Sequence, residues 1–558
     1  MKHYGQLISL GAVLVGMMLP LKGQGDAMSS SRLPPLPEGE HYLSEQPRVF
    51  VERFEFKGNT VFSDEDLAEI AEPYMNRELT TEDLHELRNI LTRHYINNGY
   101  INSGVVLPDQ EVAERVITFK VIEGVLSEKT LSGNKRLKSH YVFSRIESGI
   151  NEPLNIFELQ KPLQLLQQNR PVATINAQLA PGDALGESVL NIKVKEALPY
   201  EFHTSLSNHR SPSIGSYQLE LGGAFVNLTG WGEVVGGSYQ RRFKEGLGLA
   251  PGQDDYSIYA NIPITRWDTE LQLGFDKSSS TVVTDVFRPL DIKSESDVYR
   301  IGVRQPVYRT LSQDLSLALI VERKKSNTYL LGQPFSFSDG VDDGESRITR
   351  LNFVQEWLSR SQQSVFSIRS EIGFGVDALD ATVADATTGN AGADSKYVSW
   401  LGQVQYLRQL PLWDSQLLAR ANVRFVDAPV LPLEKFAIGG YSSVRGYREN
   451  ALTSDEGVTA SLEWRIPVVK LKVPLLSKEL EDGELQLAPF LDYGWGRNEG
   501  GVAAAPSSIS SAGMGLRWSI NRMAQAEIYW GHALRNLDFE EQDIQDSGLH
   551  FEFRMTLF

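Results

Sequence analysis

The chain has 558 residues, a formal net charge of −17 at pH 7 and no cysteine. Its length exceeds that of one ordinary domain, the missing cysteines exclude disulfides and thiolate metal sites, and the acidic balance argues against nucleic acid as a partner. After residue 22, no stretch has the roughly 18 uncharged apolar residues that a membrane-spanning helix needs. A transmembrane β-barrel remains compatible with the composition, because only every second residue of its strands is apolar.

The N-terminus has the pattern of a secretory signal. Lys2 is followed by an apolar run at 7–21 and then by small residues suited to cleavage, so we assign residues 1–27 to a signal peptide. The next segment, 28–47, contains four prolines and is expected to be an extended linker. Export into the envelope of a Gram-negative bacterium follows from this start and from the β-rich remainder.

The first part of the mature chain contains an internal repeat. The sequence FKGN at 56–59 returns as LSGN at 131–134, and ITFKVIEG at 117–124 returns as LNIKVKEA at 190–197. Both offsets are close to 75 residues. Two copies of one structural unit are therefore expected.

Each copy has a helix between its two landmarks. In the first copy Thr80 can cap the helix, and in the second Asn155 can do so, each followed by leucines that share one helical face. The pattern predicts two small α+β domains at 48–124 and 125–198. We expect them to be adaptors whose exposed strand edges can accept an extended peptide by strand addition.

From residue 199 onward the hydrophobic period changes to two. In the last segment, Leu549, Phe551 and Phe553 alternate with His550 and Glu552. About sixteen such segments have the length of roughly ten residues that a tilted membrane strand needs. A water-soluble β-sandwich could show the same alternation, so the alternation alone does not decide.

The lengths of the connections favour a membrane barrel. Transmembrane barrels have short turns on the periplasmic side and long loops outside, and short and long connections alternate here, apart from a long one near 468–482 on the periplasmic side. The short ones lie near 227–229, 264–265, 308–310, 360–362 and 409–413. The long ones lie near 278–293, 326–343, 378–393, 428–455 and 536–547. We predict an antiparallel barrel over 199–558.

No pattern of catalytic residues is present. The chain has no HExxH pair, no phosphate-binding loop and no GxSxG nucleophile elbow. Asp342 and Asp343 lie in a polar loop and are interpreted as solvated charge. We expect no enzyme activity, no cofactor and no metal site.

The long connection 428–455 has an unusual composition. Its stretch 436–447 is apolar and rich in glycine, and a single cation, Arg445, sits among the glycines. The simplest alternative is an arginine that faces water on an outer loop. However, Asp492 lies on a strand among aromatic and glycine residues, and a guanidinium can bind both oxygens of a carboxylate. We predict that the loop folds into the barrel and that Arg445 binds Asp492 there.

The loop and the strand resemble the paired signature motifs of the POTRA-bearing outer-membrane transporters. The loop motif consists of Gly439, Gly440, Val444, Arg445, Gly446 and Tyr447. The barrel-wall motif consists of Phe490, Asp492 and Gly494. The two repeats resemble POTRA domains, and the terminal Phe558 resembles the assembly signal of these barrels. Two POTRA units before sixteen strands resemble the two-partner secretion transporters of the hemolysin secretion/activation type.

This resemblance implies an outer-membrane protein with its POTRA domains in the periplasm. They would capture a large secreted exoprotein, hemolysin- or adhesin-like and β-helical, which then passes through the barrel without ATP. The loop that carries Arg445 would hold or open the passage. Other implied partners are outer-membrane lipid and the barrel assembly machinery, and the protein is expected to be a monomer. Segment 28–47 departs from the family, since it is a poor candidate for the N-terminal helix that plugs some members.

Two other functions fit parts of the sequence. An outer-membrane assembly factor that inserts other barrels shares the loop and the terminal strand, but the best-known members carry more POTRA units. A passive porin shares the barrel but has no need of capture domains. Neither the identity of the exported protein nor its activation can be read from the sequence.

Overall fold

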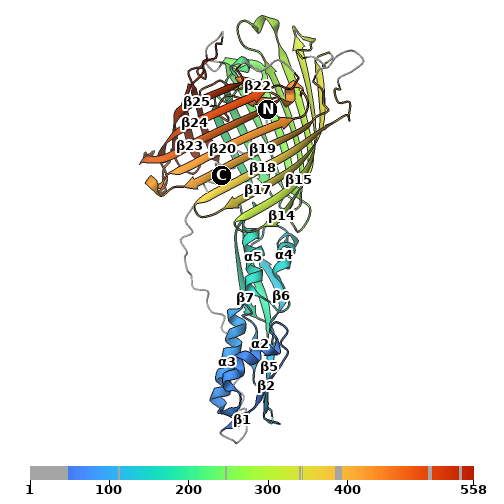
Figure 1. Ribbon diagram of the computed structural model, residues 1–558, viewed down its shortest axis with the longest axis vertical. Coiled ribbons are helices and arrows are strands. Elements are labelled where there is room, and N and C mark those ends of the chain that lie inside the picture. The colour runs from blue at the N-terminus through green and yellow to red at the C-terminus, as the bar shows by residue number, and fades with distance from the viewer. Residues whose placement is uncertain are drawn as a thin grey trace. The chain divides into compact units, whose positions relative to one another are not determined.

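The structure is a computed structural model, and Figure 1 shows its two compact units. Among the described residues, one unit comprises 48–197 together with 229–232, and the other comprises 198–228 and 233–557. The signal peptide, segment 28–47 and Phe558 lie outside the described residues. The described residues are 48–110, 114–244, 248–338, 341, 343–383, 393–500, 506–539 and 543–557.

The first N-terminal domain is a three-stranded sheet covered by helices. Its sheet order is β2-β5-β4, with β2 parallel and β4 antiparallel to the central strand. Leu67, Leu87 and Phe119 are fully buried between sheet and helices. Its elements are β1 (Val49–Val51), β2 (Arg53–Lys57), α2 (Asp64–Ala71), η1 (Glu72–Tyr74), β3 (Arg77–Leu79), α3 (Thr81–Asn97), β4 (Gly104–Val106) and β5 (Val116–Ile122).

The second domain repeats this architecture. Its sheet order is β6-β8-β7, again with one parallel and one antiparallel pair about the central strand, and Val142, Leu166 and Ile192 lie in its core. Its elements are β6 (Val125–Ser132), α4 (Ser139–Ile146), η2 (Glu147–Gly149), α5 (Ile156–Gln167), β7 (Val172–Pro181) and β8 (Glu187–Glu196). The expectation of two small α+β domains is confirmed.

The helix caps follow the sequence, with one difference. Thr80 caps α3 through a reciprocal pair of hydrogen bonds with Asp83. Asn155 caps α5 by accepting a hydrogen bond from the backbone N–H of Phe157, at 2.9 Å. Glu158 pairs with a lysine one turn further along, so the second helix starts with a single cap instead of a reciprocal one.

A carboxylate at the end of the central strand fixes the turn after the first strand in each domain. Glu123 accepts hydrogen bonds from the backbone N–H groups of Thr60 and Val61, at 2.7 and 2.9 Å, and from the Tyr95 hydroxyl at 3.0 Å. Burial favours the neutral acid, but these donors outweigh it and lower the pKa of Glu123. The two stretches that repeat in the sequence, 56–59 and 117–124, are thus joined in the fold by the contacts of Glu123 with the turn.

The second domain has the same device. Glu196 accepts three backbone N–H donors with one carboxylate oxygen, from Lys135, Arg136 and Leu137 at 2.6, 2.7 and 2.7 Å. Burial again favours the neutral form, and the three donors again lower the pKa of the group. Asn59 and Asn134 occupy matching places in the two turns, where each side chain donates to a backbone carbonyl three residues on.

We predict that Glu123→Gln destabilises the first domain by about 1–2 kcal/mol at pH 7, because the turn loses charge-assisted hydrogen bonds. The folded-state pKa of Glu123 lies below the unfolded value near 4.3. Its stabilising contribution is therefore complete above that value and is lost as the pH falls through the folded-state pKa. Urea unfolding of fragment 48–198 between pH 7 and pH 3 measures this difference.

The matched control is Glu128→Gln, since Glu128 is exposed on β6. A Glu123→Gln fragment with the same urea midpoint as the control at pH 7 would contradict the assigned role of Glu123.

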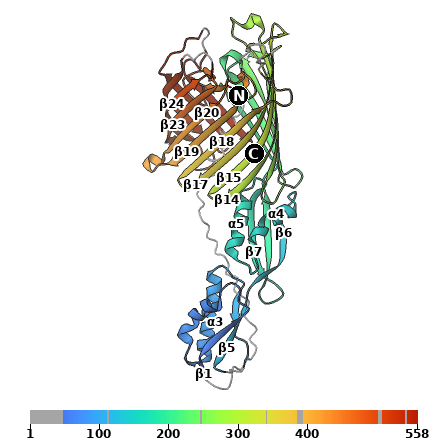
Figure 2. The same cartoon turned by 45° about the vertical axis from the view of Figure 1, so that its right-hand side comes forward.

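The C-terminal unit is a closed antiparallel barrel. Sixteen long strands form its wall, and β27 pairs with β9 to close it, with Leu557 opposite Phe202 and Glu552 opposite Ser207. Neighbouring strands run side by side at a common tilt in Figures 1 and 2. The strands are β9 (Tyr200–Ser207), β10 (Tyr217–Val226), β11 (Val234–Lys244), β12 (Gly248–Pro263), β13 (Glu270–Thr281), β14 (Lys293–Arg309), β15 (Gln313–Leu330), β17 (Glu345–Arg360), β18 (Ser364–Val376), β19 (Val398–Gln409), β20 (Gln416–Val426), β23 (Glu456–Lys470), β24 (Glu484–Arg497), β25 (Ser508–Ser519), β26 (Ala524–Ala533) and β27 (Leu549–Leu557).

Successive residues of each strand face opposite sides of the wall. Leu491 is 60% exposed while its neighbour Asp492 is 3% exposed, and Phe553 is exposed while His550 on the same strand is fully buried. This is the arrangement of a membrane barrel, which turns apolar side chains to lipid and polar ones to the lumen. The predicted fold class is confirmed.

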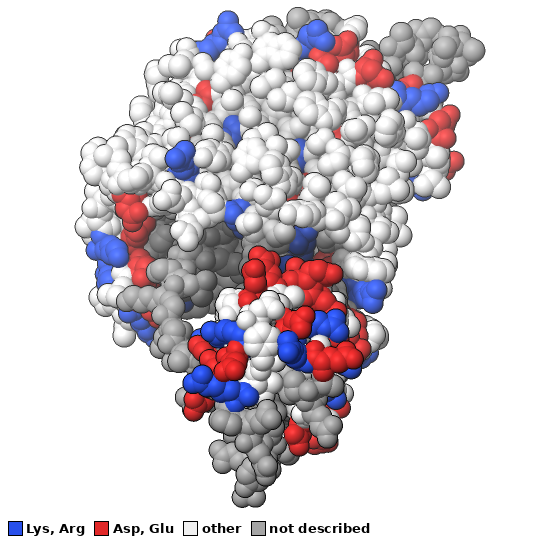
Figure 3. All heavy atoms as spheres, turned by 60° about the horizontal axis from the view of Figure 1, so that its bottom comes forward, with Lys and Arg blue, Asp and Glu red and all other residues white. Residues whose placement is uncertain are grey.

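The outer wall carries few charges. Figure 3 shows a broad surface of the barrel that is largely free of acidic and basic side chains. Exposed tryptophans lie at the short turns, among them Trp267 and Trp413, and Trp413 stacks on Trp464 with ring centroids 5.6 Å apart. Such rings are typical of the boundary between lipid and water. Among the residues that the structure describes, no helix is long and apolar enough to cross a membrane.

The connections keep the expected parity. Turns such as 310–312 and 361–363 are short, and those at the other end of the strands, such as 427–455 and 534–548, are long. The exception near 468–482 is confirmed as a long connection at 471–483. It is held together internally, because Asp482 accepts hydrogen bonds from the backbone N–H groups of Lys478 and Glu479.

Candidate functional site

The connection between β20 and β23 is a folded element and not an open loop. Its two halves pair as β21 (Phe436–Ile438) and β22 (Leu452–Ser454). Its apolar side chains form a buried cluster with Ile509 of strand β25. The loop members of this cluster are Phe436, Ile438, Val444, Tyr447 and Leu452. We call residues 428–455 the conduit loop.

Glycines let the conduit loop approach the wall. Gly446 has φ of +92°, and a Cβ there would lie 2.9 Å from the backbone of Gly531 on β26. Gly494 of β24 leaves room on the other side, since a Cβ would lie 2.3 Å from Ile438 and 2.9 Å from Val444. Any side chain at either position would push the loop off the wall.

The remaining motif residues shape the turn that carries the arginine. Gly439 and Gly440 both have positive φ, and the backbone N–H of Gly439 donates to Ser443 Oγ at 2.8 Å. Tyr447 is buried, and its hydroxyl donates to the backbone carbonyl of Ser510 on β25 at 3.0 Å. The turn is therefore fixed both within itself and to the wall.

The structure brings Arg445 and Asp492 together. Arg445 Nε donates to Asp492 Oδ2 at 2.8 Å and Nη2 donates to Oδ1 at 2.9 Å, which is the two-pronged geometry that a guanidinium and a carboxylate favour. The backbone N–H of Arg445 also donates to Asp492 Oδ2, at 3.0 Å. Ser461 Oγ of β23 accepts a third side-chain bond at 3.0 Å.

A second carboxylate and two rings complete the surroundings of Arg445. Glu463 of β23 forms an ion pair with it and also binds Arg465 Nε at 2.7 Å. The central carbon of the guanidinium lies 3.7 Å from the ring centroid of Phe490 and 4.8 Å from that of Tyr529, so both rings add cation–π attraction. Arg445 is only 1% exposed.

Sequence reasoning missed Glu463 and Tyr529. Glu463 lies on the polar face of β23 and belongs to neither sequence motif. Its position opposite Phe490 follows only from the register of β23 and β24. The signal that could have found it is the rarity of an inward carboxylate on the strand next to Asp492. Tyr529 lies on β26 and offers no comparable signal.

Comparison with known proteins identifies the family. The family model for haemolysin secretion/activation protein ShlB/FhaC/HecB matches residues 186–518, which is more than half of the chain, and the model for the ShlB-type POTRA domain matches residues 49–124. The chain belongs to the ShlB/FhaC/HecB family. Its barrel therefore lies in the outer membrane of a Gram-negative bacterium with the POTRA domains in the periplasm, and its family is that of the two-partner secretion transporters.

Individual relatives agree with this assignment. The chain is 23% identical to the outer membrane transporter CdiB of Dickeya dadantii over 76% of this chain and 74% of the relative. It is 23% identical to the heme/hemopexin transporter protein HuxB of Haemophilus influenzae over 85% and 81%. The solved structure of CdiB from Escherichia coli shares the fold with a TM-score of 0.65 at 18% identity, covering 95% of this chain and 94% of that one.

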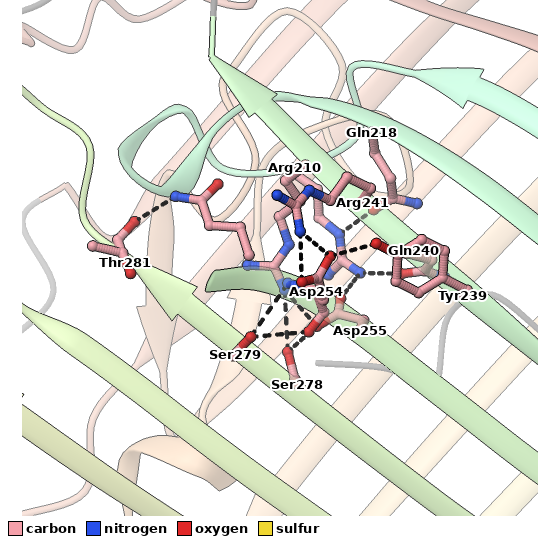
Figure 4. Close-up of polar contacts among 12 residues, drawn as sticks. Arg210, Gln218, Tyr239, Gln240, Arg241, Asp254, Asp255, Ser278, Ser279 and Thr281 are labelled. Carbon is pink, nitrogen blue, oxygen red and sulfur yellow. Dashed lines mark hydrogen bonds and ion pairs between the residues drawn. The ribbon is translucent and has the colours of Figure 1, made fainter. Parts of the chain in front are cut away.

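The lumen of this ShlB/FhaC/HecB family member contains further polar clusters. In the one drawn in Figure 4, Arg210 binds Asp255 at 2.7 Å. Arg242 also binds Asp255, at 2.5 Å. On the opposite face of the same strands, Arg241 binds both oxygens of Asp254 at 2.6 Å. Within the described part of the chain, no group of three or more histidines or carboxylates is arranged to hold a metal ion.

We predict that Gly494→Ala loosens the conduit loop, because the new methyl group would overlap Ile438 and Val444. Overpacking of this kind costs about 1–3 kcal/mol. Cleavage by trypsin after Arg448 of the purified protein should rise several-fold. The control is Gly274→Ala, where the nearest atom to a Cβ is 3.5 Å away, and equal cleavage of the two variants would contradict the prediction.

Proposed function

We propose that this transporter captures a secreted exoprotein in the periplasm and exports it through the barrel, with the conduit loop as the internal element that closes or opens the passage. The observation that carries the proposal is the buried arginine of the loop, bound to two carboxylates of the lumen wall. Because the loop contacts the wall through ion pairs, hydrogen bonds and apolar packing, all of them non-covalent, the loop can leave and return.

Capture is assigned to the two N-terminal domains, at 48–124 and 125–198. Strand β7 of the second domain is ten residues long and pairs only with β8 within the described sheet, so its other edge can accept an extended peptide. Strand β4 of the first domain is only three residues long. The longer edge therefore offers more main-chain hydrogen bonds to a cargo, which favours β7 as the site of strand addition.

Movement is assigned to folding of the cargo outside. The periplasm supplies no ATP, and neither catalysis nor a cofactor is part of the proposal. A cargo that folds at the cell surface cannot slide back as an extended chain, so folding biases the movement outward. Phe490, Asp492 and Gly494 receive the loop at the wall, and the terminal Phe558 is assigned to assembly of the barrel itself. The protein is proposed to act as a monomer, since a closed barrel leaves no strand edge to cover.

We predict that Arg445→Ala leaves the barrel inserted in the outer membrane but lowers export of the cognate exoprotein by on the order of tenfold or more. The reason is that Asp492 and Glu463 would remain buried and lose their shared cation, a change that typically costs about 3–5 kcal/mol. Export is measured as exoprotein in the medium per barrel in the membrane.

The control for this export assay is Arg522→Ala, since Arg522 is exposed in the short turn between β25 and β26. Normal export by a stably inserted Arg445→Ala protein would overturn the role given to the conduit loop.

A further inference from the structure

The conduit loop carries a second buried charge that no motif marks. Glu434 ends the short helix η8 (Pro432–Glu434), eleven residues before Arg445, and is 2% exposed. A carboxylate in such a place is stable only if it is paired and hydrogen-bonded. Its partners lie on the lumen wall.

Three cations from three strands converge on Glu434. Lys324 Nζ of β15 lies 2.5 Å from one carboxylate oxygen, and Arg350 Nη1 of β17 lies 3.0 Å from the other. Arg424 Nη2 of β20 is 3.7 Å from the second oxygen. We call Lys324, Arg350 and Arg424 the cation site. All three residues belong to strands of the barrel wall, and none belongs to the loop.

The charges of the cation site balance only when the loop is in place. Two wall carboxylates already contact it, Glu322 at 3.3 Å from both Lys324 and Arg350, and Glu371 at 2.9 Å from Arg350. Three cations and two carboxylates leave one positive charge, which Glu434 neutralises. Two other cations contact these carboxylates, and each has an acidic partner of its own. Arg369 of β18 is paired with Glu371 and also with Glu356. Arg300 of β14 lies 3.5 Å from Glu322 and is also paired with Asp276, so neither cation changes this balance.

The site around Arg445 is the inverse of this one. Asp492 and Glu463 supply two negative charges, and Arg465 is the wall cation that forms an ion pair with them. One negative charge therefore remains until Arg445 arrives. The loop thus places the carboxylate of Glu434 beside the wall cations of β15, β17 and β20. It places the guanidinium of Arg445 beside the wall carboxylates of β23 and β24.

We propose that the cation site is a carboxylate-binding site of the lumen, occupied in this state by Glu434, and that Glu434 is the second positioning residue of the conduit loop. The inference deepens the proposed function, on which it rests, by naming what else must be released when the loop moves. When the loop leaves the wall, the cation site loses its carboxylate, and Asp492 and Glu463 lose the guanidinium of Arg445 at the same time. Loss of either contact alone leaves an unpaired buried charge that favours a displaced loop.

The experiment uses the absence of cysteine from the natural chain. Ser443→Cys places one thiol on the conduit loop with little change of shape, at a position that is 8% exposed. A maleimide reagent is added to the full-length protein in outer membranes, and the rate of labelling reports how often the loop leaves the wall. Glu434→Gln in this background keeps the shape of the side chain and removes its charge.

The matched control is Glu449→Gln in the same background. Glu449 belongs to the same loop, but its carboxylate accepts a hydrogen bond from the backbone N–H of Tyr441 at 2.7 Å, a bond that glutamine can also accept. We expect labelling to rise on the order of tenfold with Glu434→Gln and to stay near the parent rate in the control. Equal rates in the two variants would overturn the inference.

One further variant keeps the test decisive. Arg424→Gln removes the most distant of the three cations, so it should raise labelling in the same direction by a smaller factor even if Glu434→Gln fails to insert. Labelling reads the loop without any cargo, so a failed labelling test and a failed export test are separate results. Unchanged labelling with Arg424→Gln, in a folded barrel, would also count against the cation site.

Discussion

The ion pairs of the Arg445 guanidinium with Asp492 and Glu463 join the conduit loop to the lumen wall. A buried guanidinium is costly unless its donors are satisfied and its charge is neutralised. Asp492, Glu463 and Ser461 do both, from two neighbouring strands, and the rings of Phe490 and Tyr529 lie against its faces. The apolar side chains of the loop pack against Ile509 in the same state.

The lipid around the barrel explains why such a contact can exist. In a membrane every backbone N–H and C=O must be paired within the protein, so the sheet closes on itself and β27 meets β9. Closure turns one face of every strand to lipid and the other to an enclosed lumen. Charged side chains are few on the first face and collect on the second, which gives the wall paired cations and anions. A loop that enters this lumen is held by these charges together with its apolar contact with Ile509 of the wall.

Much of this architecture could be predicted from local patterns. The alternation in the last strand, from Leu549 to Glu552, showed which residues face lipid, and the repeated glycine–asparagine turns marked the two POTRA domains. Arg445 and Asp492 were found because each is the one charge in an apolar, glycine-rich stretch. Glu123 was visible only as part of a repeat, and its contact with the turn at Thr60 required the fold.

Glu434 shows where such reasoning stops. It lies between a proline-containing turn and an apolar strand, and of its three cations only Arg424 is near it in sequence. Its closest cations are 110 and 84 residues earlier in the chain, on strands that carry many other charges. Only the closure of the barrel selects Lys324 and Arg350 from that set. The same is true of Glu463, which the register of β23 and β24 places beside Arg445.

The most direct test of the central contact is a double-mutant cycle between Arg445 and Asp492. Arg445→Ala, Asp492→Ala and the double variant are compared with the parent by the rate at which trypsin cleaves after Arg448. The account predicts strong coupling, so that the double variant is cleaved little faster than either single variant, since one broken contact is shared by both changes. Rates that rise independently and multiply in the double variant would contradict it.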